Sequence, residues 1–271
     1  MVSLLSFIGF YLFYCAICLR YIKTRKNSKK TAGFRREDLP NASIIIPVYN
    51  EVRVIPRKMA NLQNLRYPKD KREVVFVDGG STDGTADLIE NTVKSGELSI
   101  KVVRQGVRKG FNSAIIEGFG ETTGEIILVT GAETEYDSRA LNFMVQHFAD
   151  PQVGAVTGRQ IIKNIQEGFS PKLEVAYRNL YDFIREAESY IDSPFDIKGE
   201  IAAARRSVCK HLVEKPQLLH KGCIDACFSF QASIDGYKTV FEPNAVYYEL
   251  SPRSIRDSFR QQIRRAATLI E

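Results

Sequence analysis

The stretch EVVFVDGGSTDGT, residues 73–85, runs four consecutive apolar residues into an acidic, glycine-rich turn. Short apolar runs rich in β-branched residues are typical of buried strands. Asp78 follows this run directly, so its carboxylate must emerge at the end of the strand. The glycines supply the backbone freedom that a tight turn needs, and Asp83 stands where a helix N-cap would. The stretch therefore predicts a strand, a turn and the start of a helix.

Other apolar runs along the first half of the chain have the same character. They cover residues 43–48, 99–103 and 125–130. Segments with helical spacing follow the strands at residues 53–65, 85–95, 111–121 and 138–148. This alternation predicts a Rossmann-like parallel sheet that helices cover on both faces, with ligands beyond the carboxyl ends of the strands.

After residue 150 the alternation ends and a mixed pattern follows. We expect a strand, a long helix, a strand that enters a helix, another helix and two short strands around Pro243-Asn244. These elements fall at residues 154–162, 171–191, 195–206, 225–236 and 237–249. A final amphipathic helix begins near Pro252. The whole pattern predicts an α/β fold with a mixed C-terminal part.

The composition allows a substantial core and argues against disorder, because 44% of the 271 residues are hydrophobic. The net charge is +6, and part of it comes from the basic run that follows residue 19. Such a run beside an apolar segment is typical of contact with anionic lipid headgroups. The chain has no pattern of a nucleic-acid reader, so we expect no nucleic-acid partner.

The N-terminal segment has the pattern of a membrane anchor. It carries no charge from Val2 to Leu19, which is close to the roughly 20 apolar residues that span a bilayer. The basic residues follow the apolar segment, as in an uncleaved anchor whose remainder faces the cytoplasm. We therefore expect a transmembrane helix at 1–22 and a basic linker at 23–42. The alternative is a buried N-terminal helix.

Acidic residues gather where three of the predicted strands end. Glu51 follows the first strand, Asp78 the second, and Glu133 and Glu135 the fourth. These ends meet at one edge of a parallel sheet, which favours a ligand with hydrogen-bond donors and a cation. Glu51 is equally well explained as an acid in the first turn of a helix.

The stretches SIIIPVYNE, VVFVDGGSTDGT and GEIILVTGAETEYD, in this order and spacing, resemble the nucleotide-sugar-binding half of the family 2 glycosyltransferases, which have the GT-A fold. The resemblance covers nearly all of residues 43–271 and implies a nucleotide-sugar-binding half at 43–150 and an acceptor half at 151–251. It also implies that one group of residues lines the nucleoside pocket and that Asp78 hydrogen-bonds the base, typically uracil. That group is Pro47, Asn50 and Glu51, with Lys109 as a lesser candidate from KGFNSAIIEGFGETTGE, a stretch similar to the polyprenyl-phosphate sugar transferases.

The C-terminal half resembles the cellulose and hyaluronan synthases. KGEIAAARRSV, residues 198–208, matches their glycine-rich strand, and Ile224-Asp225 stands where they have a Glu-Asp pair. The match implies that Asp225 is the catalytic base. QQIRR stands where the family has Gln-x-x-Arg-Trp, which implies that Gln261 and Arg264 contact the donor. Arg265 replaces the family's Trp, which weakens a prediction of processive chain extension.

The resemblance also implies a divalent metal, Mg²⁺ or Mn²⁺, on an Asp-x-Asp motif after the fourth strand. The aligned residues are Gly131-Ala132-Glu133, so the first acid is missing. Glu133 corresponds to the acid that touches the metal, and Glu135 to a further ligand of the polyprenyl-phosphate branch. We expect Asp137 to cap the following helix.

The final segment, 252–271, carries an arginine stripe and an apolar stripe. This pattern fits a helix at a membrane surface and equally fits a soluble amphipathic helix.

These observations predict an inverting glycosyltransferase at the membrane that moves a sugar from a nucleotide-diphosphate donor, by preference a UDP-sugar, to a lipid-linked or saccharide acceptor. The alternative is a catalytically weak member of the family that binds nucleotide or a partner at the membrane. The combined absence of the family's acids at positions 131 and 224 and of its Trp at 265 motivates it.

Overall fold

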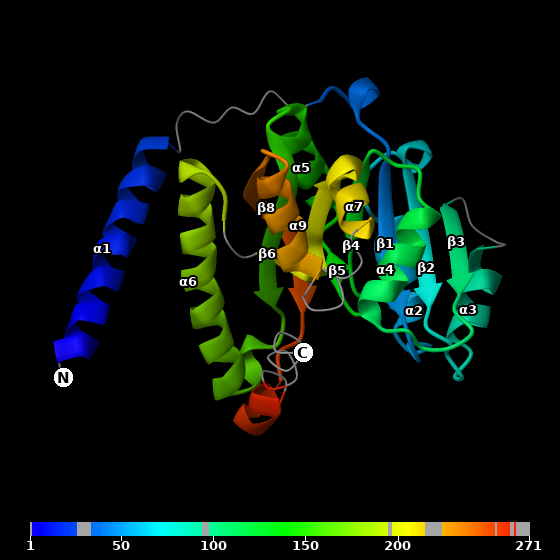
Figure 1. Cartoon of the computed structure of the whole chain (residues 1–271). Coiled ribbons are helices and arrows are strands. Elements are labelled where there is room, and N and C mark those ends of the chain that lie inside the picture. Colours follow the sequence, from blue (N-terminus) through cyan, green and yellow to red (C-terminus); the bar gives the residue numbers. More distant parts are fainter. Residues whose placement is uncertain are drawn as a thin grey trace.

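An eight-stranded sheet forms the centre of the computed structural model (Figure 1), in the order β3-β2-β1-β4-β7-β6-β8-β5. The structure describes residues 2–25, 34–93, 98–194, 197–214, 224–252, 254–260 and 263. The strands are β1 (Ala42–Val48), β2 (Arg72–Asp78), β3 (Ser99–Arg104), β4 (Ile126–Val129), β5 (Glu135–Tyr136), β6 (Val153–Ile162), β7 (Ala202–Arg205) and β8 (Lys238–Glu249). The helices are α1 (Val2–Arg25), α2 (Ile55–Gln63), α3 (Thr85–Val93), α4 (Phe111–Gly120), α5 (Ala140–Gln146), α6 (Phe169–Ile191), α7 (Arg206–Val213) and α9 (Ile224–Ile234).

The first four strands are parallel, as the sequence predicts. β1 lies between β2 and β4, and Val48 pairs in register with Asp78. The turns that follow β1 and β2 therefore begin at the same level, and Gly79 N–H donates to the Val48 carbonyl over 2.9 Å. This register brings the predicted ligand-binding turns together.

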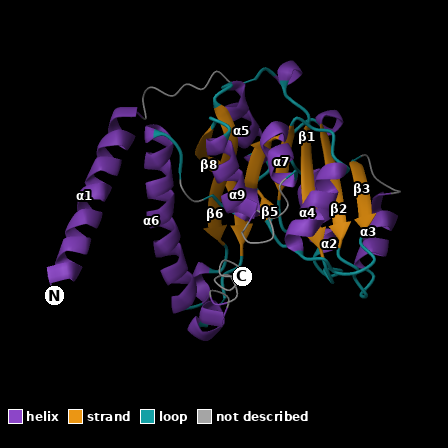
Figure 2. Cartoon of the chain, viewed as in Figure 1, coloured by secondary structure: helices purple, strands orange, loops and turns teal. Residues whose placement is uncertain are grey.

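Helices cover both faces of the sheet (Figure 2). Neighbouring residues of a strand point to opposite faces, and the apolar strand residues therefore pack against helices on each side. Ile44 and Ile46 pack with α2 and α5, whereas Ile45 packs with α4, α7 and α9. All three isoleucines are fully buried, and each contributes about 1.5–3 kcal/mol of burial free energy. The near-continuous apolar strands are thus explained by a sheet that is buried on both sides.

In the C-terminal half the sheet becomes mixed. β7 pairs antiparallel with β4 on one side and with β6 on the other. The sequence predicts two short strands around Pro243-Asn244, and this is wrong: β8 is one strand of 12 residues. Its pairing with β6 shifts register between Gly158 and Arg159, which is a bulge. A Cβ at Gly158 would lie 2.1 Å from the Ala245 carbonyl oxygen, so the bulge needs glycine there.

The N-terminal helix α1 lies beside α6 at one side of the molecule (Figure 1), where Tyr14 Oη donates to Glu188 Oε1 over 2.7 Å. Within the described ranges we find no helix with the length and apolar character of a membrane span. The transmembrane helix expected at 1–22 is therefore not supported by the structure.

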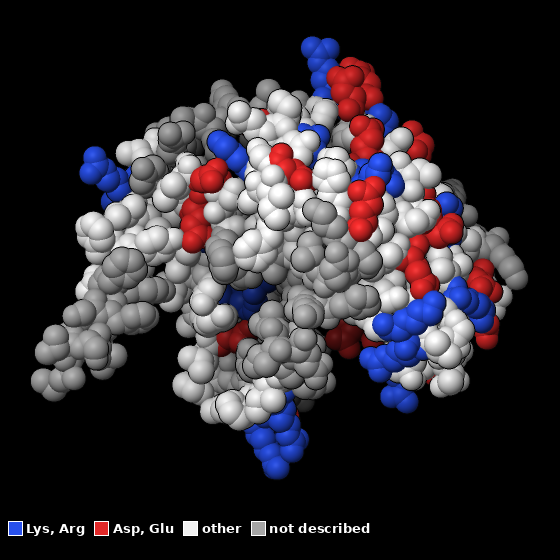
Figure 3. All heavy atoms as spheres, viewed as in Figure 1, with Lys and Arg blue, Asp and Glu red and all other residues white. Residues whose placement is uncertain are grey.

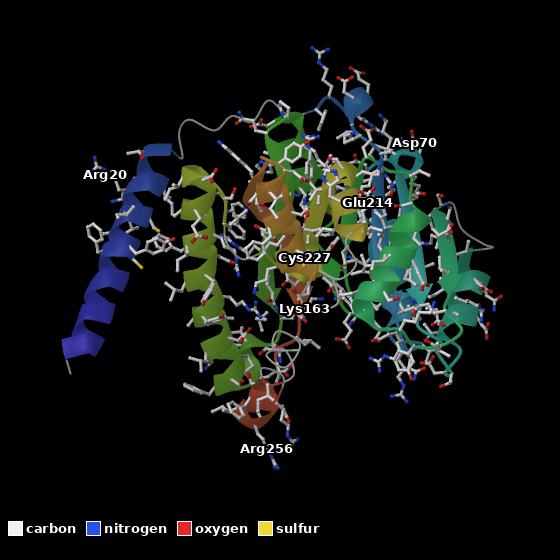
Figure 4. All side chains as sticks on the ribbon, viewed as in Figure 1. Arg20, Asp70, Lys163, Glu214, Cys227 and Arg256 are labelled. Atoms are coloured by element: carbon white, nitrogen blue, oxygen red, sulfur yellow. The ribbon has the colours of Figure 1, made fainter. Side chains whose placement is uncertain are left out.

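Only the beginning of the expected final helix lies within the described residues. Residues 255–260 are helical and sit near the start of α6 at the lower end of the molecule (Figure 1). Ile255, Phe259 and Ile263 are each more than half exposed. Figure 3 shows basic side chains at this lower tip, where Figure 4 labels Arg256.

Candidate functional site

The carboxylate of Asp78 is held at the end of β2 with one oxygen unpaired. Its Oδ2 accepts hydrogen bonds from the Gly80 N–H over 3.2 Å and the Ser81 N–H over 3.0 Å. Gly80 reaches this position with φ of 79°, which favours glycine. Asp78 is only 3% exposed, and its Oδ1 has no hydrogen-bond partner among the described residues. A buried orphan acceptor costs free energy, so this oxygen is suited to a ligand's N–H group.

A cavity of about 110 Å³ lies at the same edge of the sheet. Pro47, Tyr49, Gln105 and Arg108 are among its lining residues. The Arg108 guanidinium lies 4.3 Å from the centre of the Tyr49 ring. Gln105 is buried, and its Oε1 also lacks a hydrogen-bond partner in the described part of the chain. The cavity therefore offers a flat surface, formed by Arg108 stacked on Tyr49, and polar side-chain atoms of Gln105. Both are suited to a nucleobase.

The structure places Arg108, and not the predicted Lys109, at this cavity. Lys109 Nζ pairs with Glu117 Oε1 over 2.8 Å on the surface of α4. The two residues are adjacent in the sequence, and spacing does not decide which of them faces the ligand. Contact with the aromatic ring of Tyr49 is what orients Arg108.

Asn50 and Glu51 lie in the turn after β1, close to the turn after β2. Asn50 has φ of 55°, and its Oδ1 accepts from the Thr82 N–H over 2.9 Å. The Glu51 N–H donates to Thr85 Oγ1 over 2.8 Å. Asp83 accepts from the backbone N–H groups of Val52 and Thr85 over 3.1 and 3.0 Å, so it joins the two turns as well as starting α3. These bonds fix the Glu51 backbone and leave its carboxylate available.

Negative charge accumulates between the turns after β1 and β4. Burial raises the pKa of Glu51, and the charges of Glu133 and Asp83 raise it further. Glu133 itself is exposed. Repulsion between two carboxylates is relieved when a cation lies between them. The arrangement therefore favours a divalent ion beside Glu133.

Glu135 is placed differently from the prediction that it binds metal. Its Oε1 pairs with Arg57 Nε over 2.9 Å, and its Oε2 pairs with Lys163 Nζ. These side chains, with Glu133, line a cavity of about 250 Å³ at the lower edge of the sheet, where Figure 4 labels Lys163. In the described ranges no three acidic, histidine or cysteine side chains form a metal-binding group. Glu133 with the oxygens of a bound diphosphate fits Mg²⁺, which often takes one or two carboxylates plus phosphates.

A buried lysine that was not predicted from the sequence, Lys58, donates hydrogen bonds to the turn after β4. Lys58 is 1% exposed, and its Nζ donates to the Thr134 carbonyl over 2.8 Å and to Thr130 Oγ1 over 3.4 Å. Burial lowers its pKa to about 7. The signal was present in the sequence, because Lys58 lies on the same helical stripe as Ile55, Met59 and Leu62 of α2, which are all buried.

Three predicted site residues cannot be placed by their side chains. Asp225 is the second residue of α9, but its side chain lies outside the described part of the structure. Gln261 and Arg264 lie outside the described residues altogether.

Comparison with known proteins identifies related chains. The family described as glycosyl transferase family 2 matches residues 43–213. A poly-β-1,6-N-acetyl-D-glucosamine synthase of Staphylococcus epidermidis is 24% identical over 230 residues, which are 84% of this chain and 54% of that protein. The chain thus spans about half the length of this curated relative.

Two solved structures have the same fold. A mannosyltransferase from Pyrobaculum calidifontis, in complex with GDP-Man and Mn²⁺, is 27% identical with a TM-score of 0.75 and covers 97% of this chain and 72% of its own. TarS of S. aureus, in complex with UDP-GlcNAc, is 17% identical with a TM-score of 0.56 and covers 84% of this chain and 66% of its own. The likeness supports an α/β fold of the GT-A type with a mixed sheet.

The lowered pKa of Lys58 predicts how stability depends on pH. The folded protein releases the Lys58 proton near pH 7, whereas the unfolded chain holds it to about 10.5. Unfolding therefore takes up a proton between these values, and the Lys58 contribution to stability rises as pH rises through this window. In urea unfolding at pH 7 and 9.5, we expect wild type to gain up to about 3 kcal/mol relative to Lys58→Met at the higher pH.

Lys210→Met is the control, because Lys210 is exposed on α7. A difference between wild type and Lys58→Met that stays constant from pH 7 to 9.5 would show that Lys58 titrates normally.

Proposed function

The chain belongs to glycosyl transferase family 2, and on that premise we propose that it moves a sugar from a uridine-diphosphate donor to a saccharide or lipid-linked acceptor. The observation that carries the proposal is the unpaired Asp78 Oδ1 at the end of β2. Beside it, Gln105 and the Arg108–Tyr49 stack offer the polar atoms and the flat wall that a nucleobase needs.

The geometry at Asp78 favours uracil over guanine. Guanine presents two adjacent N–H donors on one edge and so pairs best with both oxygens of a carboxylate, whereas uracil presents one N–H between two carbonyls. The Oδ2 of Asp78 already accepts from two backbone N–H groups, so Oδ1 alone is available. This supports a UDP-sugar, the donor type found with TarS, over a GDP-sugar such as that found with the mannosyltransferase.

We propose that Glu133 holds Mg²⁺ or Mn²⁺ against the donor diphosphate. A divalent ion there would supply positive charge for the diphosphate leaving group. Two observations support this assignment: Glu133 is exposed, and its charge adds to the effect of burial in raising the pKa of Glu51. Glu135 serves instead to fix Arg57 and Lys163 at the cavity beside Glu133. These two cations would draw the phosphates towards Glu133.

Asp225 is the proposed base that accepts the proton of the acceptor hydroxyl. Attack from the face of the sugar opposite the diphosphate would invert the anomeric centre. Asp225 is the second residue of α9, and an acid in the first turn of a helix is favoured by the helix dipole. The proposed donor contacts of Gln261 and Arg264 rest on the sequence resemblance.

The lower end of the molecule is the proposed membrane surface. Phe169, Leu173 and Tyr177 form an exposed stripe at the start of α6, at spacings of four residues. The exposed apolar side chains of 255–263 and the basic Arg256 lie at the same end (Figures 1 and 4). Apolar and basic side chains together suit anionic lipid. A membrane at this end would hold the acceptor on the same side of the molecule as the cavity beside Glu133.

Replacement of Asp78 tests the donor assignment. In Asp78→Asn the amide nitrogen would oppose the uracil N–H, so UDP affinity should fall about 10- to 100-fold, the value of a hydrogen bond to a charged group. The same amide can donate to the ring nitrogen of cytosine, so CDP affinity should rise. Isothermal titration with UDP, CDP and GDP measures all three, with the exposed Asp87→Asn of α3 as control. Tighter binding of GDP than of UDP by wild type would contradict the assignment.

Replacement of the proposed base separates catalysis from binding. Asp225→Asn should lower UDP release from UDP-sugars by about 10²–10⁴-fold and leave UDP affinity within about twofold. Asp235→Asn, which follows the end of the same helix, should keep wild-type turnover. Normal turnover of Asp225→Asn would refute the base assignment. A wild-type protein that binds UDP but releases none from any UDP-sugar would favour the alternative of a catalytically weak member.

The membrane surface can be tested with single tryptophans, because the chain has none of its own. Phe259→Trp should shift its emission to shorter wavelength when vesicles containing phosphatidylglycerol are added. Ile234→Trp is the control, since Ile234 is exposed. It lies near the start of β8, whereas Lys163 lies next to the other end of that strand. Equal behaviour of the two variants would contradict the proposal.

A further inference from the structure

A third cavity, of about 780 Å³, lies at the amino ends of β1 and β2. In Figure 4 the label of Asp70, which immediately precedes this part of β2, is at the top of the molecule, and Lys163 of the lower cavity is well below it. Arg72 and Asp78 are the first and last residues of β2. At about 3.3 Å per residue they are roughly 20 Å apart. The cavity is therefore separate from the proposed donor site.

The walls of this cavity are basic. Its cationic lining residues are Arg36, Arg66, Lys69, Arg72 and Arg139. The other lining residues are apolar, aromatic or amide side chains, and none of the described residues that line it is acidic. The nearest counter-charge to Arg139 is Asp137, 3.8 Å from its Nε. This lining attracts an anion.

Arg72 is the strongest sign of a built site. It is 4% exposed, and its Nε, Nη1 and Nη2 have no hydrogen-bond partner within the described ranges. Burial lowers the pKa of this guanidinium. A buried cation without a partner is unfavourable, and the planar donor fork of arginine matches a phosphate. Burial of the Arg72 guanidinium lowers the stability of the ligand-free protein, and a bound phosphate would offset this cost.

A buried acceptor lines the same cavity. Gln146 of α5 donates through Nε2 to the Phe34 carbonyl over 3.4 Å, and its Oε1 has no partner among described residues. Asn142, one turn earlier on α5, donates to the Arg66 carbonyl over 2.6 Å. These bonds hold two wall segments in place. They leave one acceptor for an N–H or O–H group of a ligand.

Aromatic rings form the remaining wall. Phe34, Tyr67 and Phe143 all line the cavity. Tyr67 is held by a hydrogen bond of 2.5 Å from its Oη to the Pro40 carbonyl. The Arg139 guanidinium lies 5.4 Å from the centre of the Phe143 ring. Fixed rings beside guanidinium groups are suited to a flat, polar ring.

We propose that this cavity binds a nucleotide-type organic phosphate, with its phosphate on Arg72 and its ring among Phe34, Tyr67 and Phe143. The volume lies within the range of small-molecule sites. A ring N–H or a ribose hydroxyl would satisfy Gln146 Oε1. This site is additional to the donor site of the proposed function and does not depend on it.

The binding test uses AMP as the probe, with EDTA to remove divalent ions, and is repeated in Asp78→Asn, whose change lies in the proposed donor site. In isothermal titration we expect saturable AMP binding that is at least tenfold tighter than that of inorganic phosphate, and none with adenosine. Arg72→Met should abolish it, and Arg72→Lys should retain part of it. Lys210→Met, an exposed change of equal charge, should bind as wild type does.

Three results would overturn the proposal: absence of AMP binding, unchanged binding by Arg72→Met, or phosphate binding as tight as that of AMP. Thermal melting supplies a second readout. If Arg72 is paired only when a ligand is bound, then Arg72→Met should melt at a higher temperature than wild type in the absence of AMP. AMP should raise the melting temperature of wild type and not that of Arg72→Met. A lower melting temperature or failure to fold would show that Arg72 has a structural role instead. The exposed Arg66→Gln, which leaves the core intact, should weaken AMP binding several-fold.

Discussion

Repulsion between Glu51 and Glu133 is the interaction on which this account of the site depends. The parallel register of β1, β2 and β4 brings their turns to one end of the sheet. Burial raises the pKa of Glu51 there, and the charges of Glu133 and Asp83 raise it further. Lys58 lies beneath the acidic turn, but its pKa of about 7 leaves it only partly charged at neutral pH. Arg57 and Lys163 are paired with Glu135. The proposed divalent ion would reduce the repulsion between the two acids.

Much of the first half could be predicted from the sequence, because its signals are local. Alternation of apolar strands and amphipathic helices defined the four parallel strands, and the residue after each strand had to lie at the functional edge. The bulge in β8 was missed because it depends on Gly158 meeting a distant backbone. The ion pairs of Glu135 and the position of Arg108 could not be read from the sequence for a similar reason: they depend on partners that are remote in sequence, Lys163 and Tyr49.

The strand β2 connects the two proposed sites. Among the described residues, one oxygen of Asp78 at its carboxyl end and the guanidinium of Arg72 at its amino end have no hydrogen-bond partner. Both are buried at the ends of a strand that is fixed on both sides by β1 and β3. A rigid strand can hold such unsatisfied groups in a buried position, whereas on an exposed loop the same side chains would form hydrogen bonds with water. The sequence reveals the acid through its motif, but nothing around Arg72 marks that residue as buried.

The most direct test of the central claim is the metal dependence of UDP binding. Isothermal titration of wild type and Glu133→Gln with UDP, each with and without Mn²⁺, isolates the contribution of the acidic turn. We predict that Mn²⁺ tightens UDP binding by wild type and has no effect on Glu133→Gln, while the two proteins bind UDP equally without metal. An equal Mn²⁺ effect in both proteins, or none in wild type, would contradict the account.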